Sequence, residues 1–231
     1  MIHTMQYSDW EPTYEEILDD FGFDRRKDEE SARIAADIMS QRDINVDIVK
    51  AEIERLLNGK EVIICGNAPC LEADIKERAI FTPSRVVIAA DGATSVLLRN
   101  ASIIPDIVVT DLDGNIADII YANRLGAIMV VHAHGDNIEM LIKILPALNA
   151  NVICTTQSMP LHNVYNFGGF TDGDRCVFIA TEFGARRIEL AGFDFGDESV
   201  SARKKKKLKW AKRLIEDVLL TNSLQRIEHD F

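Results

Sequence analysis

Six short runs of apolar, mostly β-branched residues alternate with helical stretches in the sequence from Lys60 onward. The runs that favour strands are Val62–Cys65, Val86–Ala90, Ile107–Thr110, Ile128–Val131, Val152–Thr155 and Ile188–Ala191. The stretches that favour helices are Leu71–Arg78, Thr94–Asn100, Ile116–Leu125, Ile138–Leu148 and Asp174–Phe183. Strands that are apolar throughout are typical of a parallel sheet covered on both faces. With right-handed crossovers, the pattern predicts an α/β fold with a doubly wound, mostly parallel, Rossmann-like sheet.

The first 59 residues follow a different pattern and are rich in acidic side chains. Apolar residues recur at helical spacing over Ser31–Gln41 and Val46–Leu57, and Thr13 with Glu16 predicts a capping box. We therefore expect a helical N-terminal segment over residues 1–59 and a Rossmann-like domain over residues 60–231 that ends in a basic helix. The N-terminal segment would form either a helical layer or a dimerisation arm, and the second alternative would make the chain a homo-oligomer.

Composition excludes several classes of protein. The net charge of −11 argues against a nucleic-acid partner, because phosphate backbones require a basic surface. The four cysteines form no CxxC pair, so a zinc site is not expected and the pattern suits a reducing compartment. No apolar run approaches the roughly 18 residues of a membrane span, and no secretory signal precedes the domain. We expect a cytoplasmic protein with no membrane partner.

Polar residues follow every predicted strand. In strand order they are Gly66-Asn67-Ala68-Pro69, then Asp91-Gly92, then Asp111 and Asp113, then His132, His134, Asp136 and Asn137, then Thr156-Gln157-Ser158, and finally Asp194 and Asp197. The carboxyl ends of parallel strands meet at one edge of the sheet, which is where open α/β sheets bind ligands. The sequence therefore predicts an acid-rich binding site at that edge.

The segment Asp111-Leu112-Asp113-Gly114 is the best candidate for a metal site. If the segment is extended, residues two apart point to the same side, so both carboxylates can face one cation while Leu112 faces the core. Magnesium prefers such hard oxygen ligands together with substrate phosphates. The alternative is a turn at Asp113-Gly114 with Asp111 as a cap. Asp91 and Asp136 on neighbouring strand ends favour the metal, although Asp136 could instead cap the next helix.

Three other segments have features of ligand-binding sites. The Gly66–Pro69 turn between a strand and a helix would present backbone N–H groups to phosphate, although it is not a Walker A loop. His134 could orient phosphate or accept a proton, whereas ordinary hydrogen bonding suits His132. The loop Asn166–Arg175 combines glycines, two aromatic rings and polar groups, as in a pocket for a flat heterocycle, or it is a loop capped at Thr171 or Asp172. Arg175 could pair with phosphate or with Asp172.

The stretch Arg203–Arg213 carries eight Lys/Arg residues and no acid. It would form either a solvated helix face or a basic patch that attracts a triphosphate.

Seven motifs in this order resemble those of the archaeal 6-hydroxymethyl-7,8-dihydropterin pyrophosphokinases. They are GNAPxL (Gly66–Leu71), ADGAT (Ala90–Thr94), PDIVVTDLDG (Pro105–Gly114), HAHGDN (His132–Asn137), TTQ (Thr155–Gln157), NFGGFTDGDR (Asn166–Arg175) and GFDF (Gly192–Phe195). The resemblance implies magnesium-dependent transfer of pyrophosphate from ATP to the pterin hydroxymethyl group, on the route to folate or methanopterin. The acidic block also resembles thiamine pyrophosphokinases, but Thr110 and Gly114 depart from their GDxDS element. No series of short strands follows Ala191 to form their second, all-β domain.

We expect the site residues to fall into three groups. Magnesium would be held by Asp111, Asp113 and Asp136, and His134 or Asp136 could take the proton of the acceptor hydroxyl. ATP would contact Gly66, Asn67, Ala68, Pro69, Asp91, Gly92, Arg175 and Lys204. The acceptor, a small heterocyclic alcohol, would contact Asn137, Gln157, Asn166, Phe167, Gly169, Phe170, Thr171, Asp172 and Asp174. Two alternatives remain, which are a thiamine pyrophosphokinase and a nucleotide-binding regulator without turnover.

Overall fold

The structure is a computed structural model that describes residues 5–77, 82 and 84–229. Within these residues, seven strands form one sheet in the order β6-β5-β4-β3-β2-β1-β7, and every pair of neighbouring strands is parallel. The strands are β1 (Glu61–Cys65), β2 (Val86–Ala90), β3 (Ile107–Thr110), β4 (Ile128–Ala133), β5 (Val152–Thr156), β6 (Val164–Tyr165) and β7 (Arg187–Ala191). The predicted α/β fold is confirmed.

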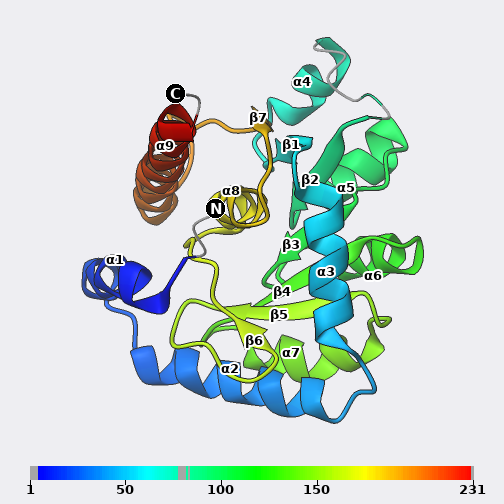
Figure 1. Ribbon diagram of the computed structural model, residues 1–231, viewed down its shortest axis with the longest axis vertical. Helices are drawn as coiled ribbons and strands as arrows, with labels where there is room; N and C mark the ends of the chain where they lie inside the picture. Colours follow the sequence, from blue (N-terminus) through cyan, green and yellow to red (C-terminus); the bar gives the residue numbers. More distant parts are fainter. Residues whose placement is uncertain (1–4, 78–81, 83, 230–231) are drawn as a thin grey trace.

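Helices cover both faces of the sheet (Figure 1). They are α1 (Tyr7–Phe21), α2 (Arg25–Ser40), α3 (Val46–Leu57), α4 (Leu71–Glu77), α5 (Ala93–Val96), α6 (Ile116–Arg124), α7 (Ile138–Ile144), α8 (Asp172–Glu182) and α9 (Ala202–His229), with a π-turn at Leu97–Ala101 and a 3₁₀ turn at Leu145–Ala147. Helices α4 to α7 share one face with α2, because β1 to β5 advance in one direction through crossovers of one hand. Helices α3, α8 and α9 cover the other face, since α8 returns the chain from the β6 edge to the β7 edge.

The sheet has its switch point between β1 and β7. The chain leaves β1 toward α4 on one face and leaves β7 toward α9 on the other. Connections that diverge in this way open a crevice at the carboxyl ends of the two strands. The topology alone therefore places a ligand site beside the loops that begin at Gly66 and Gly192.

The N-terminal segment is helical, as predicted, but it begins earlier than its sequence suggests. The expected capping box of Thr13 and Glu16 is wrong, because α1 starts at Tyr7 with Gln6 as its N-cap and contains Pro12 in its interior. A proline inside a helix removes one backbone hydrogen bond. Burial of the apolar face of α1 against α8 and α9 offsets that loss. Its buried residues are Trp10, Tyr14, Ile17 and Leu18.

Other element bounds differ from the predicted ones by a few residues. Strand β4 continues to Ala133, because His132 is buried and its Nδ1 lies 3.1 Å from Thr155 Oγ1 on β5. Strand β6 was not predicted, since a strand of two residues is too short to show an alternating pattern of apolar and polar residues. Arg78, the last residue of the helix expected over Leu71–Arg78, lies outside the described residues.

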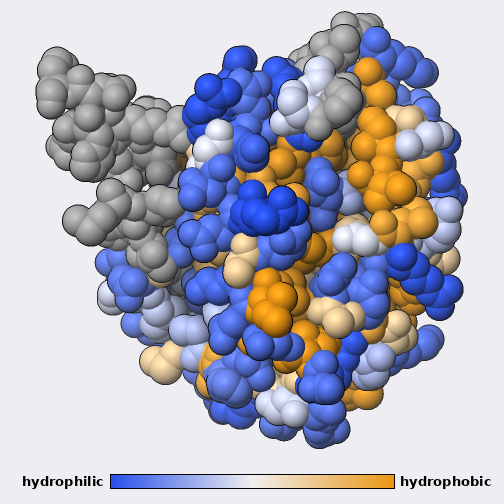
Figure 2. Space-filling view, turned by 45° about the vertical axis from the view of Figure 1, so that its right-hand side comes forward, coloured by the Kyte–Doolittle hydropathy of each residue, from blue (hydrophilic) through white to orange (hydrophobic). Residues whose placement is uncertain are grey.

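The surface combines charged and apolar residues. On the face shown in Figure 2, hydrophobic patches lie between hydrophilic ones. The exposed apolar side chains include Ile48, Ile104 and Leu125, which border a shallow hollow beside α3. No helix in the described part of the chain has both the length and the apolar character to cross a membrane.

Candidate active site

A cavity of about 790 Å³ lies at the carboxyl edge of the sheet, as the sequence predicts. Loops from six strand ends line it, together with the α1–α2 turn, the start of α8 and one side of α9. Of the predicted site residues, the lining includes Gly66, Asn67, Ala68, Pro69, Asp91, Gly92, Asp111, Asp113, His134, Asp136, Gln157, Phe170, Thr171, Asp172, Arg175 and Lys204. The size suits a small-molecule site.

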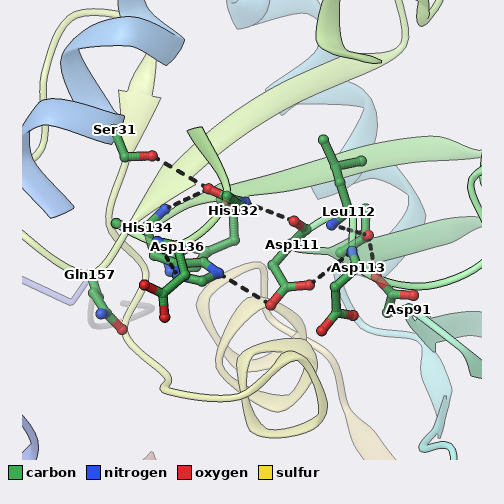
Figure 3. Close-up of polar contacts among 12 residues, drawn as sticks. Ser31, Asp91, Asp111, Leu112, Asp113, His132, His134, Asp136 and Gln157 are labelled. Atoms are coloured by element: carbon green, nitrogen blue, oxygen red, sulfur yellow. Dashed lines mark hydrogen bonds and ion pairs between the residues drawn. The ribbon is translucent and has the colours of Figure 1, made fainter. Parts of the chain in front are cut away.

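Three carboxylates gather at the centre of the cavity. One oxygen each from Asp91, Asp111 and Asp113 lies within 4.8 Å of the other two. Figure 3 shows Asp111 between His134 and Asp113, with Asp91 on the far side of Asp113. We call these three residues the carboxylate cluster. Asp136 lines the same cavity but does not belong to the cluster, so in this geometry Asp91 occupies the third position that the sequence suggested for Asp136.

The cluster is assembled by a tight turn rather than by an extended strand end. The predicted extended geometry is wrong, because Leu112 adopts a left-handed conformation with φ of 67°. Its side chain is nevertheless buried in the core, as expected. Two hydrogen bonds hold the turn, one from Leu112 N–H to Thr110 Oγ1 at 2.8 Å and one from Asp113 N–H to Asp111 Oδ1 at 3.3 Å. The turn thus brings the carboxylates of Asp111 and Asp113 close together.

Gly114 completes the turn because no side chain fits there. A Cβ at this position would lie 1.6 Å from Asp91 Oδ1. The other oxygen of Asp91, Oδ2, accepts a hydrogen bond from Thr110 Oγ1. Thr110 and Gly114, the two departures from the thiamine pyrophosphokinase pattern, therefore both serve to position the Asp91 carboxylate.

The electrostatics of the cluster are those of crowded carboxylates. Burial, partly offset by the hydrogen bond from Thr110, raises the pKa of Asp91 to about 6, and the charges of Asp113 and Asp111 act in the same direction. Burial and the charge of Asp111 also raise the pKa of Asp113. Although burial opposes it, the hydrogen bond and charge of His134 leave the pKa of Asp111 below its ordinary value. Such mutual repulsion would be relieved by a bound cation.

The two histidines after β4 differ in environment. His132 is buried, and desolvation lowers its pKa well below the ordinary value, so the imidazole is neutral. His134 lines the cavity and places Nε2 3.3 Å from Asp111 Oδ2. Asp136 is exposed beside it, and its N–H donates to His134 Nδ1 at 3.3 Å. His134, Asp136 and His132 thus all line the cavity, but His132 is buried and its Nδ1 is held by Thr155.

The loops at the switch point between β1 and β7 form one end of the cavity. Gly66 packs so closely on β7 that a Cβ would lie 2.5 Å from Gly192 O, and the Ala68 N–H donates to the same carbonyl at 2.9 Å. Gly92 is equally tight against the Asn67 side chain, where a Cβ would lie 2.3 Å from Nδ2. The predicted phosphate-binding turn therefore lies directly beside the carboxylate cluster.

Helix α9 adds positive charge to the cavity. Arg203, Lys204 and Lys207 line the cavity, and the charge of Lys207 opposes the rise that burial and Asp111 cause in the pKa of Asp113. In contrast, Lys205 forms an ion pair with Glu198, and Lys206 forms one with Asp20 at 2.7 Å. The basic run is thus divided between the cavity and the surface.

The loop Asn166–Arg175 contributes to the cavity only through its second half. Thr171 caps α8 as predicted, in a capping box with Asp174. Arg175 is buried and donates to the carbonyls of Gly168, Gly169 and Phe170, which is a structural role. Asp172 lines the cavity, and burial together with the charges of Asp111 and Asp91 raises its pKa well above the ordinary value.

Five predicted acceptor-binding residues lie behind the cavity wall, outside the described lining. They are Asn137, Asn166, Phe167, Gly169 and Asp174. Asn137 donates to the carbonyls of Asp111 and His132 at 2.7 Å, and Asn166 donates to Ser158 O at 2.8 Å. Phe167 stacks on Tyr165 inside the core. Asn137 thereby supports the cavity wall from behind, since it ties the segments after β3 and β4 together.

The N-terminal segment contributes residues that no sequence motif indicated. Phe21, Phe23, Lys27 and Asp28 all line the cavity. Phe21 and Phe23 stack at 5.3 Å, and Phe21 also contacts Phe170 at 5.1 Å. The helices of residues 5–59 therefore form a layer, and the turn between α1 and α2 completes the site.

Several known proteins have sequences similar to this chain. The family model described as 6-hydroxymethylpterin diphosphokinase MptE-like matches residues 40–199. A protein of Methanothermobacter thermautotrophicus named 6-hydroxymethyl-7,8-dihydropterin pyrophosphokinase is 44% identical over 239 residues, which cover 97% of this chain and 99% of that protein. A protein of the same name from Methanocaldococcus jannaschii is 45% identical, over 83% of this chain and 81% of that protein. Another from Pyrococcus furiosus is 42% identical, over 92% of this chain and 94% of that protein. The chain therefore belongs to the 6-hydroxymethylpterin diphosphokinase MptE-like family.

Proposed function

We propose that the protein transfers a pyrophosphoryl group from ATP to the hydroxymethyl group of 6-hydroxymethyl-7,8-dihydropterin and releases AMP. The observation that carries the proposal is the carboxylate cluster in the centre of a cavity, on a chain that belongs to a diphosphokinase family. The acceptor oxygen would attack the β-phosphorus in line with the leaving AMP. Such a transfer depends mainly on positioning and on neutralising charge.

The order of strands supports a division of the cavity into two halves. The turn at Gly66–Pro69 follows β1, lies against the end of β7 and suits the nucleotide. The ends of β4 and β5, with His134 and Gln157, lie on the opposite side of the carboxylate cluster and suit the acceptor. The reacting groups would then meet over β2 and β3.

The carboxylate cluster has the chemistry of a magnesium site. It offers hard oxygen ligands, and Asp91 Oδ1 is buried without a hydrogen-bond partner among the described residues. Asp91, Asp111 and Asp113 would hold the ion, which supplies positive charge to the transferring phosphates. The hydrogen bond from Thr110 and the lack of a side chain at Gly114 keep Asp91 oriented toward it.

Around this centre, the other cavity residues would orient the reactants. Lys204 and Lys207 would hold phosphate oxygens of ATP. His134 or Asp136 would accept the proton of the acceptor hydroxyl, since both face the cavity on the acceptor side. Gln157, Phe170, Thr171 and Asp172 would line the pterin pocket.

The thiamine alternative has less support. After β7 the described chain forms helix α9 and not a second, all-β domain, and the three relatives compared above are named for the pterin. Incubation of the protein with ATP and magnesium, with either the dihydropterin or thiamine, tests the proposal. We expect AMP only with the dihydropterin. AMP with thiamine would support the alternative, and nucleotide binding without AMP would support a regulator.

A further inference from the structure

We propose that Asp28, on helix α2, recognises the aminopyrimidinone edge of the acceptor ring together with Gln157, an inference that rests on the proposed pterin substrate. Asp28 is 5% exposed and lines the cavity, although it belongs to the N-terminal segment and not to the sheet. It would therefore determine which heterocycle the enzyme accepts, at a distance from the phosphate chemistry.

Three donors hold the Asp28 carboxylate in place. Oδ2 accepts hydrogen bonds from the Tyr14 hydroxyl and from Gln157 Nε2, each at 2.7 Å, and Oδ1 accepts one from the Gly135 N–H at 2.9 Å. Burial and the negative charge of Asp28 raise the pKa of Tyr14, so its hydroxyl keeps its proton and donates. A carboxylate offers about four acceptor positions, so one remains on Oδ1.

The bond to Asp28 also fixes the orientation of Gln157. An ionised carboxylate only accepts, so the atom that contacts it must be the amide nitrogen. The backbone carbonyl of Gln157 is held in turn by Trp10 Nε1 at 2.9 Å. Within the described residues, Gln157 Oε1 and the second Nε2 hydrogen have no hydrogen-bond partner.

The groups that remain match the acceptor ring. Asp28 and Gln157 together offer two acceptors, Asp28 Oδ1 and Gln157 Oε1, and one donor, the second N–H of Gln157. The aminopyrimidinone edge of a pterin offers two donors, the 2-amino group and N3–H, and one acceptor, the 4-oxo group. A buried polar site of this kind selects strongly, because a ring that lacks one partner leaves a buried group unpaired.

The position of the pair is suitable for an acceptor site. Asp28 bonds to Gly135, the residue after His134, and His134 contacts Asp111 of the carboxylate cluster. Figure 3 shows Gln157 on the His134 side, opposite Asp91. The phenyl rings of Phe21, Phe23 and Phe170 line the same cavity and could cover a flat ring.

The test compares binding of 6-hydroxymethylpterin with binding of its analogue without the 2-amino group. We expect calorimetry to show that the wild-type protein binds the pterin at least 10-fold more tightly, and that Asp28→Asn loses most of this preference. The KM for the dihydropterin should rise about 10- to 100-fold in Asp28→Asn, while the dissociation constant of a non-hydrolysable ATP analogue stays the same.

Two controls separate recognition from stability. Asp37→Asn changes an exposed acid on the same helix and should alter the binding of neither the pterin nor the ATP analogue. Tyr14→Phe removes one donor to Asp28 and should lower the melting temperature while the preference for the pterin persists.

The proposal is overturned if Asp28→Asn keeps the wild-type preference. It is equally overturned if the wild-type protein binds both rings alike, a measurement that requires no variant to fold. In either case AMP release by the wild-type protein with the dihydropterin would leave the proposed function standing, whereas a wild-type protein that neither binds the pterin nor releases AMP would overturn both.

Discussion

The substitution Asp91→Asn should change how the stability of the metal-free protein depends on pH. Asp91 is 6% exposed, and burial raises its pKa to about 6 from an ordinary value of 3.8. Between these two values the folded protein keeps a proton that the unfolded chain has lost, so stability falls as pH rises through this window. The difference of about 2 pH units corresponds to roughly 3 kcal/mol of destabilisation, which is fully present above pH 6 and absent below pH 4.

Asparagine cannot ionise, so the variant lacks the destabilisation that ionisation of Asp91 causes in the wild type. In the presence of a chelator, we compare the free energies of unfolding of Asp91→Asn and the wild type. The value for the variant minus that for the wild type should increase by roughly 3 kcal/mol between pH 4 and pH 7, which means that the variant gains stability relative to the wild type. Using the difference removes the titration of the groups that do not interact with Asp91. Urea unfolding at several pH values measures it. A difference that stays constant across this range would refute the buried, crowded carboxylate.

Magnesium supplies the complementary measurement. Addition of the ion at pH 7 should stabilise the wild type by about 1.4 kcal/mol at ten times its dissociation constant, and should stabilise Asp91→Asn less. Equal stabilisation of both proteins would exclude Asp91 from the metal site.

Four further substitutions test the surrounding geometry. Asp113→Asn should lower the rate of AMP release about 100-fold, because a positioned charge at a transferring phosphoryl group contributes about 3 kcal/mol, and its melting temperature should hold or rise as repulsion is relieved; a destabilised but fully active variant would contradict this. Lys204→Gln and Lys207→Gln should each raise the KM for ATP about 5-fold at low salt and less at high salt. Lys205→Gln changes a lysine that is paired with Glu198 and should leave the KM for ATP unchanged. Equal effects of all three substitutions would mean a general charge effect. Gly114→Ala should raise the magnesium concentration needed for activity, because a Cβ would displace Asp91, while Gly196→Ala, where the nearest atom is 3.6 Å away, serves as the control; unchanged magnesium dependence of Gly114→Ala would contradict the account of the turn.

The sheet and the strand-end residues could be predicted because apolar strand runs alternate regularly with stretches of helical spacing in the sequence. Each apolar strand is followed directly by polar residues, and parallel strands place those residues on one edge whatever the order of the strands. Asp111, Asp113 and Gly66 were therefore predictable positions. The order of strands is set by contacts far apart in the sequence, and the separation of nucleotide and acceptor sides follows from that order.

Other features carry no local signal. Leu112 is an apolar residue that rarely takes a left-handed conformation, and only the hydrogen bonds of Thr110 and Asp111 hold it there. Asp28 is one acid in a helix rich in both acidic and basic residues, and its contacts with Tyr14, Gly135 and Gln157 distinguish it from exposed neighbours. Tertiary structure decides both, so sequence periodicity could not predict them.

The most direct test of the central claim is ³¹P nuclear magnetic resonance of the products formed from ATP, magnesium and 6-hydroxymethyl-7,8-dihydropterin. Pyrophosphoryl transfer predicts AMP and a pterin ester that carries two coupled phosphorus atoms, since the β- and γ-phosphoryl groups move together. Formation of ADP and a pterin ester with a single phosphorus would show attack at the γ-phosphorus and would contradict the proposed reaction.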